Sequence, residues 1–480
     1  MKRNGFILIA ILMMSLSVKA QYLLSSTHLY SAPASELQIY ADLAGLPDSI
    51  SEINGVEIFK LRYNTVDVFG NPTIASGALY VPQVSCDTLP MLSFQHGTVM
   101  DERKVPSSRS DDLAGYFYAG SGYITVMPDY LGLGDNPGIH PYIHWESEAT
   151  AGLDIIRAAR EFLKDSLKIL DNGQLFITGY SQGGHATMAM HKYIQVHDLQ
   201  DEFNIVASAP MSGPYSLSYA QMNMILNEDS SYYKSDFLPY LFASYNLVYG
   251  NLFSDYSQYY DPPFDSLIAS WDSSGIYFQN AYPGMIPDKY YDFMQDSVLD
   301  NIKTLSDHPV NVALRKNDLH NWAPQEPVRM LYCLMDSMVS PLNSVIALDT
   351  MLALGAPDVQ AINVYSEGDH GSCTVPAFFY ALAWFNSLAV KCSVSPTRIS
   401  VDLAPEIKIY PNPTGDLITI EINEPALHLI EINSINGQSV FKGTMEGTSH
   451  QIDLFPFQKG VYIITIRSKD FVTTKKIIKL

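Results

Sequence analysis

The chain has 480 residues, of which 50 are acidic and 29 basic, giving a formal net charge of −21. This length allows two or three domains and a sizeable core. The negative charge argues against nucleic acid or an anionic membrane surface as the main partner.

The first 20 residues have the pattern of a signal peptide. Lys2 and Arg3 precede an apolar stretch from Phe6 to Leu16, and Val18-Lys19-Ala20 is a small-x-small cleavage site. The apolar stretch is too short to span a bilayer, which disfavours a retained anchor, and no later segment is apolar enough for a transmembrane helix. We therefore expect export to the periplasm and a mature chain that begins at Gln21.

Between residues 21 and 392, apolar runs alternate with helical stretches. The predicted strands are 56–68, 73–81, 90–94, 123–127, 174–178, 204–209, 328–334 and 360–365. The predicted helices are 34–44, 111–119, 146–164, 185–196 and 375–388. Near-continuous apolar strands that alternate with helices predict an α/β domain, with a mostly parallel sheet covered by helices on both faces.

One long interval, from Pro214 to Asn321, breaks this alternation and is crowded with tyrosines. An insertion of this length predicts a cap over the functional face of the sheet. Most of its aromatic rings are expected to form the cap's own core. A few are expected to face a pocket, where a ring offers apolar area with a polar tip.

The composition changes after residue 392. Ser393 to Pro405 is polar and contains proline, as expected of a linker. From residue 406 to 480 short alternating strands follow one another, and Asn436-Gly437 is a strong hairpin signal. This pattern predicts a small C-terminal all-β sandwich of the immunoglobulin-like kind.

The four cysteines allow two disulfides in an exported chain without requiring them. Cys333 lies in an apolar run and is predicted to be a buried free thiol. Cys373 and Cys392 flank a predicted helix about 20 Å long, so they should not pair with each other. The spacing of Cys and His residues suggests no metal site.

The segment Gly179-Tyr180-Ser181-Gln182-Gly183-Gly184 has the pattern G-x-S-x-G. A β-branched and aromatic run precedes it, and a stretch with helical composition follows. A strand, a tight glycine turn and a helix form the nucleophile elbow, which exposes a serine hydroxyl at the edge of a parallel sheet. Ser181 is therefore the predicted nucleophile, with an ordinary glycine-rich turn as the alternative.

A serine nucleophile needs a base, and the base needs an orienting acid. In this fold the acid and the histidine follow the serine in that order. Asp336 lies on the loop after the predicted strand 328–334, and His370 is the one histidine between Asp336 and the linker. Asp369 is the runner-up for the acid, although it adjoins the predicted base.

Ester or amide cleavage also requires donors for the tetrahedral oxyanion. The N–H of Gln182, directly after the serine, is one candidate. The second is the N–H of Thr98, in the loop Gln95-His96-Gly97-Thr98, with the Thr98 hydroxyl as a possible third. His96 is expected to fix this loop rather than to transfer protons. The chemistry assigned to these residues requires no cofactor.

These residues together resemble the α/β-hydrolase superfamily. The likeness is greatest to secreted lipases and esterases that carry a PDYLGLG loop, an HPY segment and a GYSQGG elbow, here Pro128–Gly134, His140–Tyr142 and Gly179–Gly184. The resemblance covers about residues 37–388. It implies an α/β-hydrolase domain at 21–392 with a cap insertion at about 214–321.

The C-terminal residues resemble the sorting domain of the type IX secretion system of Bacteroidetes. The resemblance rests on Ile409–Pro413, Asn436–Gln438, Gly460–Tyr462 and the basic Lys475–Ile478. It implies that residues 406–480 address the chain to the secretion machinery, for release or for attachment at the cell surface.

The sequence thus predicts a secreted serine hydrolase that cleaves small-molecule esters with an apolar acyl or aromatic group. A serine peptidase of the prolyl-peptidase type uses the same triad and is the first alternative. An acidic clamp for a free amine in the cap would favour it. The cap holds carboxylates, such as Glu228 and Asp229, but nothing in the sequence singles them out as a clamp. A non-catalytic surface binding protein is the second alternative, and the complete set of triad residues argues against it.

Overall fold

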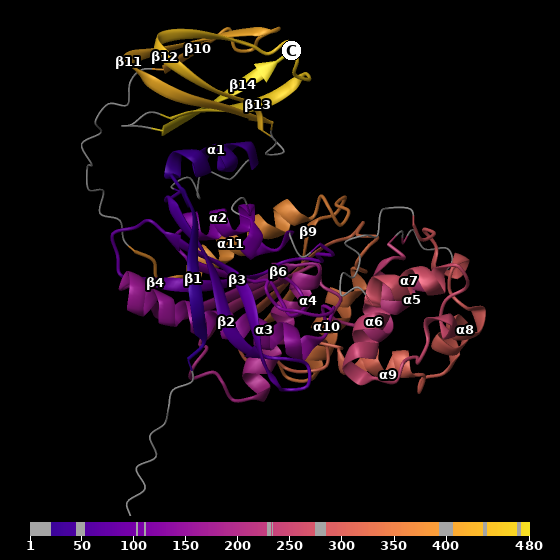
Figure 1. Cartoon of the computed structure of the whole chain (residues 1–480). Coiled ribbons are helices and arrows are strands. Elements are labelled where there is room, and N and C mark those ends of the chain that lie inside the picture. The colour runs from indigo at the N-terminus through magenta and orange to yellow at the C-terminus, as the bar shows by residue number, and fades with distance from the viewer. Residues whose placement is uncertain are drawn as a thin grey trace, which may run out of the picture.

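The computed structural model describes residues 21–44, 53–101, 104–109, 112–227, 232, 234–273, 285–392, 407–434, 439–467 and 472–480. The predicted signal peptide, the linker and the Asn436-Gly437 turn lie outside these residues. A helix-flanked sheet, interrupted by a helical insertion, is followed along the chain by a small all-β tail (Figure 1).

The central sheet has nine strands in the order β1-β2-β3-β5-β4-β6-β7-β8-β9. Their bounds are β1 (Leu23–Ala32), β2 (Val56–Val66), β3 (Pro72–Pro82), β4 (Thr88–Gln95), β5 (Ile124–Pro128), β6 (Leu170–Tyr180), β7 (Ile205–Met211), β8 (Val328–Cys333) and β9 (Val359–Tyr365). The first three strands and the β3–β5 pair are antiparallel, and the pairs from β5 to β9 are parallel. The carboxyl ends of six neighbouring strands therefore meet at one edge, where α/β sheets bind ligands.

Helices cover both faces of this sheet, as the alternating pattern predicts. Helices α3 (Trp145–Phe162), α4 (Gln182–Val196) and α10 (Leu342–Ala353) pack on one face. Helices α1 (Ala34–Ala44), α2 (Leu113–Gly120) and α11 (Thr374–Leu388) pack on the other. Each face has its own apolar core, so the parallel strands are buried on both sides.

Strand β1 is not anticipated by the sequence pattern. It pairs with β2 at the outer edge of the sheet, and most of its side chains are exposed. An edge strand with both faces partly in water needs no apolar alternation, which removes the signal on which strand prediction relies.

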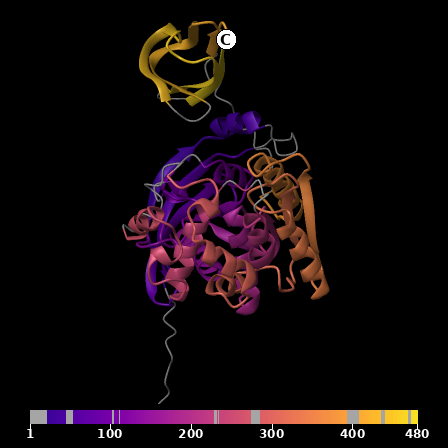
Figure 2. The same cartoon turned by 90° about the vertical axis from the view of Figure 1, so that its right-hand side faces the viewer.

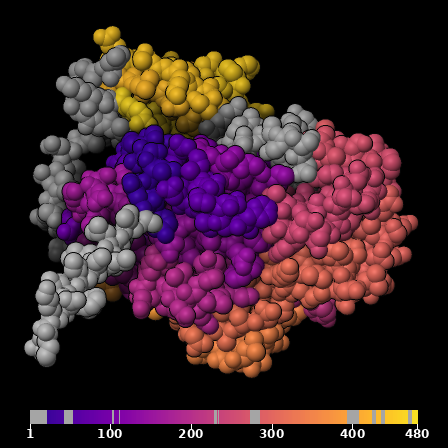
Figure 3. Space-filling view, turned by 60° about the horizontal axis from the view of Figure 1, so that its bottom comes forward, coloured from indigo at the N-terminus to yellow at the C-terminus, as the bar shows by residue number. Residues whose placement is uncertain are grey.

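A helical insertion, residues 212–327, separates β7 from β8. It contains α5 (Met222–Ile225), α6 (Phe237–Tyr249), α7 (Phe264–Ser273), α8 (Asp296–Thr304) and α9 (Pro309–Lys316). In the space-filling view its residues form a lobe beside the indigo and purple N-terminal part of the chain (Figure 3). Most of its buried tyrosines pack into its own core, as expected, including Tyr245, Tyr259 and Tyr260.

The C-terminal part is all-β, as predicted, but its strands are longer than the sequence suggests. They are β10 (Ile407–Tyr410), β11 (Leu417–Ser434), β12 (Ser439–Asp453), β13 (Gly460–Arg467) and β14 (Val472–Lys479). The first half of β11 pairs with β10 and the second half with β13, with an irregularity between Glu421 and Ala426. Residues 417–422 and 427–432, which the sequence predicts as two short strands, are therefore halves of one strand. They surround a compact isoleucine-rich core of their own (Figure 2).

Candidate active site

The sequence around Ser181 adopts the predicted strand–turn–helix geometry. Strand β6 ends at Tyr180 and α4 begins at Gln182, so Ser181 is the turn residue, with φ of 61°. A positive φ is strained for a residue with a side chain, and such strain is typical of functional turns. A Cβ atom at Gly183 would collide with the carbonyl oxygen of Gln95, which explains the glycine there.

The three residues predicted to act together lie in hydrogen-bonding contact. The Nε2 atom of His370 is 2.9 Å from the Ser181 hydroxyl oxygen, and its Nδ1 atom is 2.7 Å from Asp336 Oδ2. The other carboxylate oxygen of Asp336 accepts hydrogen bonds from the backbone N–H groups of Met338 and Val339. The Asp336 carboxylate is thus buried, oriented and aimed at the imidazole.

Asp369, the runner-up for the acid, faces away from the imidazole. Its carboxylate accepts hydrogen bonds from the backbone N–H and the hydroxyl of Ser372, at 2.8 and 2.6 Å. These bonds hold the pKa of the exposed Asp369 carboxyl below its usual value. They form a local turn that shapes the loop carrying His370.

A disulfide joins the two loops that carry Asp336 and His370. Cys333, at the end of β8, is bonded to Cys373 at the start of α11, so the prediction of a free Cys333 thiol is wrong. The apolar run around Cys333 correctly predicts that this residue is buried. The run does not reveal the disulfide, because the partner lies 40 residues away in the sequence. The second disulfide is Cys86–Cys392, so Cys373 and Cys392 do not pair with each other, as predicted.

The loop that follows β4 lies beside the elbow. The Thr98 hydroxyl oxygen is 2.9 Å from the Tyr142 hydroxyl oxygen. The His96 ring bonds to the backbone oxygens of Gly97 and Asp129 and packs against the ring of Tyr130, which agrees with a role in fixing the loop.

The start of α4 supplies the other predicted donor. The first N–H groups of a helix have no acceptor within it, so the Gln182 N–H can bind an oxyanion there.

Two buried carboxylates near the site have hydrogen-bond partners that no sequence pattern reveals. The Asp129 carboxylate is fully buried and accepts hydrogen bonds from the hydroxyls of Ser76 and Ser107. Glu148, on α3, contacts Gln182 and His185. Both partners of each carboxylate lie tens of residues away, so only the fold brings them together.

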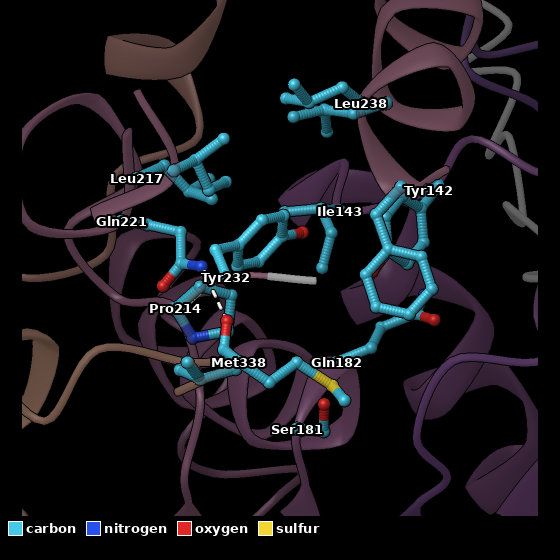
Figure 4. A pocket seen from close by; sticks show the side chains of 14 residues that line it. Tyr142, Ile143, Ser181, Gln182, Pro214, Leu217, Gln221, Tyr232, Leu238 and Met338 are labelled. Carbon is cyan, nitrogen blue, oxygen red and sulfur yellow. Dashed lines mark hydrogen bonds between the residues drawn. The ribbon is translucent and has the colours of Figure 1, made fainter. Parts of the chain in front are cut away.

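An apolar cavity opens beside Ser181, with Leu217 and Leu238 at its far end and Tyr142 along one side (Figure 4). The Gln221 amide donates to the carbonyl oxygen of Met338, so its polar atoms are occupied by the protein. The described lining residues are Tyr142, Ile143, Ser181, Gln182, Pro214, Leu217, Gln221, Ile225, Tyr232, Phe237, Leu238, Leu241, Met338 and Val339. None of those described residues is charged.

The comparisons with known proteins agree with this architecture. A putative hydrolase from Legionella pneumophila superposes with a TM-score of 0.69 at 24% identity, covering 77% of this chain and 98% of that one. The rice cell wall degrading esterase LipA from Xanthomonas oryzae, in a ligand-bound form, gives 0.66 at 26% identity, covering 76% and 97%. Candida antarctica lipase A in its closed state gives 0.53 at 16% identity, covering 77% and 83%. The larger region has the α/β-hydrolase fold.

The C-terminal residues match a family model. Residues 408–480 match the secretion system C-terminal sorting domain, as the sequence resemblance implies. No curated protein matches the chain. Within the described residues, no helix has the length and apolar character needed to cross a membrane, and no three potential metal ligands cluster together.

The buried His140 ring makes the stability of the protein dependent on pH. Burial lowers the pKa of His140 to about 3, against about 6.5 for an exposed histidine. Below pH 6.5 this ring is protonated in the unfolded chain but stays neutral in the native state. The free energy of unfolding should therefore fall as the pH falls from 6.5 towards 3, by up to about 1.4 kcal/mol per pH unit from this ring.

His140→Gln should reduce that slope, measured by urea unfolding between pH 7 and 4.5. His144, whose pKa burial lowers to about 4, acts with the same sign in both proteins. Burial raises the pKa of Asp129, so this group makes the free energy of unfolding rise as the pH falls. Its contribution is the same in the wild type and in His140→Gln. The exposed His197→Gln is the matched control. Equal slopes in wild type and His140→Gln would contradict the assignment of a neutral buried ring.

Proposed function

We propose that this protein is a serine hydrolase that cleaves carboxylic esters through an acyl-enzyme. The observation that carries the proposal is the hydrogen-bonded chain from Ser181 through His370 to Asp336. Ser181 lies on the strained turn at the sheet edge. The likeness to an esterase at 26% identity supports the ester as the scissile group.

The geometry suggests the following sequence of steps. His370 Nε2 takes the proton of the Ser181 hydroxyl as its oxygen attacks the ester carbonyl carbon. The N–H groups of Gln182 and Thr98 stabilise the resulting oxyanion. The imidazolium then returns the proton to the leaving alcohol, and a water molecule repeats the sequence to release the acid. Asp336 holds the imidazole in the required tautomer and stabilises its charged form.

The cavity favours an ester over a peptide with a free amino terminus. A buried ammonium group needs a carboxylate partner, and the described lining residues include none. Glu228 and Asp229, the two cap carboxylates considered for such a clamp, lie outside the described residues. The apolar lining instead suits an alkyl or aromatic acyl group, because contact with such side chains removes apolar surface from water.

Acyl-chain length should control the specificity constant. Burial of one methylene contributes about 0.8 kcal/mol, so each added carbon should raise kcat/KM by up to about fourfold until the cavity is full. The test is kcat/KM for p-nitrophenyl acetate, butyrate, octanoate and palmitate. Leu238→Trp should move the optimum to a shorter chain, whereas Trp at the exposed Leu352 should not. A steady fall from acetate onward would show an acetylesterase instead.

The C-terminal domain is proposed to direct the protein to the outside of the cell through the secretion machinery. It has its own core and supplies no residue to the candidate active site. A chain that ends near Ser400 should therefore hydrolyse soluble esters at the wild-type rate. In the native host the same truncation should leave the enzyme in the periplasm, measured by fractionation. Normal export of the truncated chain would contradict the sorting role.

A further inference from the structure

The side chain of Gln182 is held beneath the elbow by two buried partners. Gln182 is 1% exposed, and its Nε2 atom lies 3.0 Å from Glu148 Oε1 and 2.8 Å from His140 Nε2. Each of the two amide hydrogens thus has its own acceptor. The backbone N–H of the same residue is a proposed oxyanion donor, so these contacts bear on the position of that donor.

The hydrogen-bond partners define the protonation of His140. Its Nδ1–H donates to the carbonyl oxygen of Leu131 at 2.7 Å, which leaves Nε2 as the acceptor for the Gln182 amide. The lowered pKa of this buried ring agrees with the neutral form. His140 is therefore suited to anchor the amide and unsuited to transfer protons.

Glu148 contacts a buried histidine as well as holding Gln182. Its Oε2 atom is 2.7 Å from His185 Nδ1, and His185 Nε2 is 3.0 Å from the carbonyl oxygen of Asn317. The His185 ring is therefore held between these two oxygens. One oxygen of the Glu148 carboxylate contacts the ring while the other accepts from the Gln182 amide, so the carboxylate is fixed in place beneath the elbow.

The oxygen atom of the Gln182 side-chain amide, Oε1, shows that stability alone does not account for a buried glutamine at this position. Within the described residues, Gln182 Oε1 is buried with no hydrogen-bond donor. A buried acceptor without a donor costs stability, and such groups in native proteins call for an explanation. An apolar side chain of similar length would avoid that cost and would lose both anchoring bonds.

We propose that Glu148 and His140 are positioning residues, which fix the Gln182 side chain so that its backbone N–H points at the oxyanion. This inference rests on the proposed function. Loss of the contacts from Glu148 and His140 to the Gln182 side chain should weaken binding of the transition state. Binding of the ester in its ground state should stay unchanged.

The test compares Glu148→Gln with wild type in the hydrolysis of p-nitrophenyl butyrate. A glutamine can accept from Gln182 or from His185 but cannot serve both as a carboxylate does. We expect kcat per active site, titrated with a fluorophosphonate, to fall 10- to 100-fold with KM within twofold, because a donor displaced from its place stabilises the oxyanion poorly. The inhibition constant of an alkyl trifluoromethyl ketone, which forms a tetrahedral adduct, should rise by the same factor as kcat/KM falls.

The matched control is Glu326→Gln. Glu326 also pairs with a buried histidine of α4, His191, but has no contact with Gln182. The Glu326→Gln variant should keep kcat and the inhibition constant of the ketone within twofold of wild type.

A second variant keeps the inference testable if Glu148→Gln folds poorly. Gln182→Met retains the backbone N–H and removes the anchoring amide, so it should reproduce the fall in kcat. The double variant should be no slower than the slower single variant, because both changes break one interaction. Wild-type kcat and ketone inhibition in Glu148→Gln, or additive losses in the double variant, would overturn the inference. Failure of the wild type itself to hydrolyse esters would instead overturn the proposed function.

Discussion

Replacement of Ser181 by alanine is expected to lower kcat for ester hydrolysis by about 10⁴-fold or more while the protein stays folded. The change removes the oxygen that attacks the carbonyl carbon and leaves only the oxyanion donors and the binding site. Alanine is no larger than serine, so the crowded turn between β6 and α4 should accept it. The measurements are steady-state kinetics with p-nitrophenyl butyrate and a thermal melt.

Ser387→Ala, at an exposed serine on α11, is the matched control and should keep the wild-type rate. His370→Ala should be about as damaging as Ser181→Ala, and the two changes together should be no worse than either alone, because the triad acts as a unit. Residual activity of Ser181→Ala within tenfold of wild type would rule out the nucleophile.

Replacement of Asp336 by asparagine should lower kcat by about 10⁴-fold. The amide has nearly the shape of the carboxylate, but it cannot hold the His370 tautomer with Nε2 free to accept the serine proton, and it does not stabilise the imidazolium. The 2.7 Å contact with His370 Nδ1 and the two backbone donors to Asp336 place this carboxylate where the charge is needed.

Asp369→Asn is the internal comparison for this prediction, since Asp369 contacts Ser372 rather than the imidazole. It should retain activity within a few-fold of wild type. If Asp369→Asn were severely impaired and Asp336→Asn nearly normal, the acid would be assigned to the wrong residue.

The parts of the site that are local in sequence could be predicted from it. The elbow needs a strand, a serine between glycines and a helix in succession, and glycines at 183 and 184 leave room for the carbonyl oxygens of Gln95 and Met211 at the ends of the neighbouring strands. Asp336 and His370 could be placed because loops at the ends of parallel strands meet at one edge. The structure brings the three side chains together.

The parts that depend on contacts between distant segments could not be predicted. The Cys333–Cys373 disulfide needs β8 and α11 side by side, and an apolar run around one cysteine looks the same with a free thiol. The Glu148 anchor of Gln182 depends on α3 lying against α4. Edge strand β1 lacks a periodic signal because most of its side chains are exposed. The two halves of β11 do alternate, but the irregularity between Glu421 and Ala426 hides their continuity.

The most direct test of the central claim is the mass of the protein after reaction with an alkyl fluorophosphonate, which modifies activated serine hydroxyls. We expect one adduct per chain, and peptide mapping should locate it on Ser181. Esterase activity should be lost in proportion to labelling. His370→Ala should label far more slowly, because its serine lacks the base. An enzyme that hydrolyses esters while Ser181 stays unmodified, or that loses activity through labelling elsewhere, would contradict the central claim.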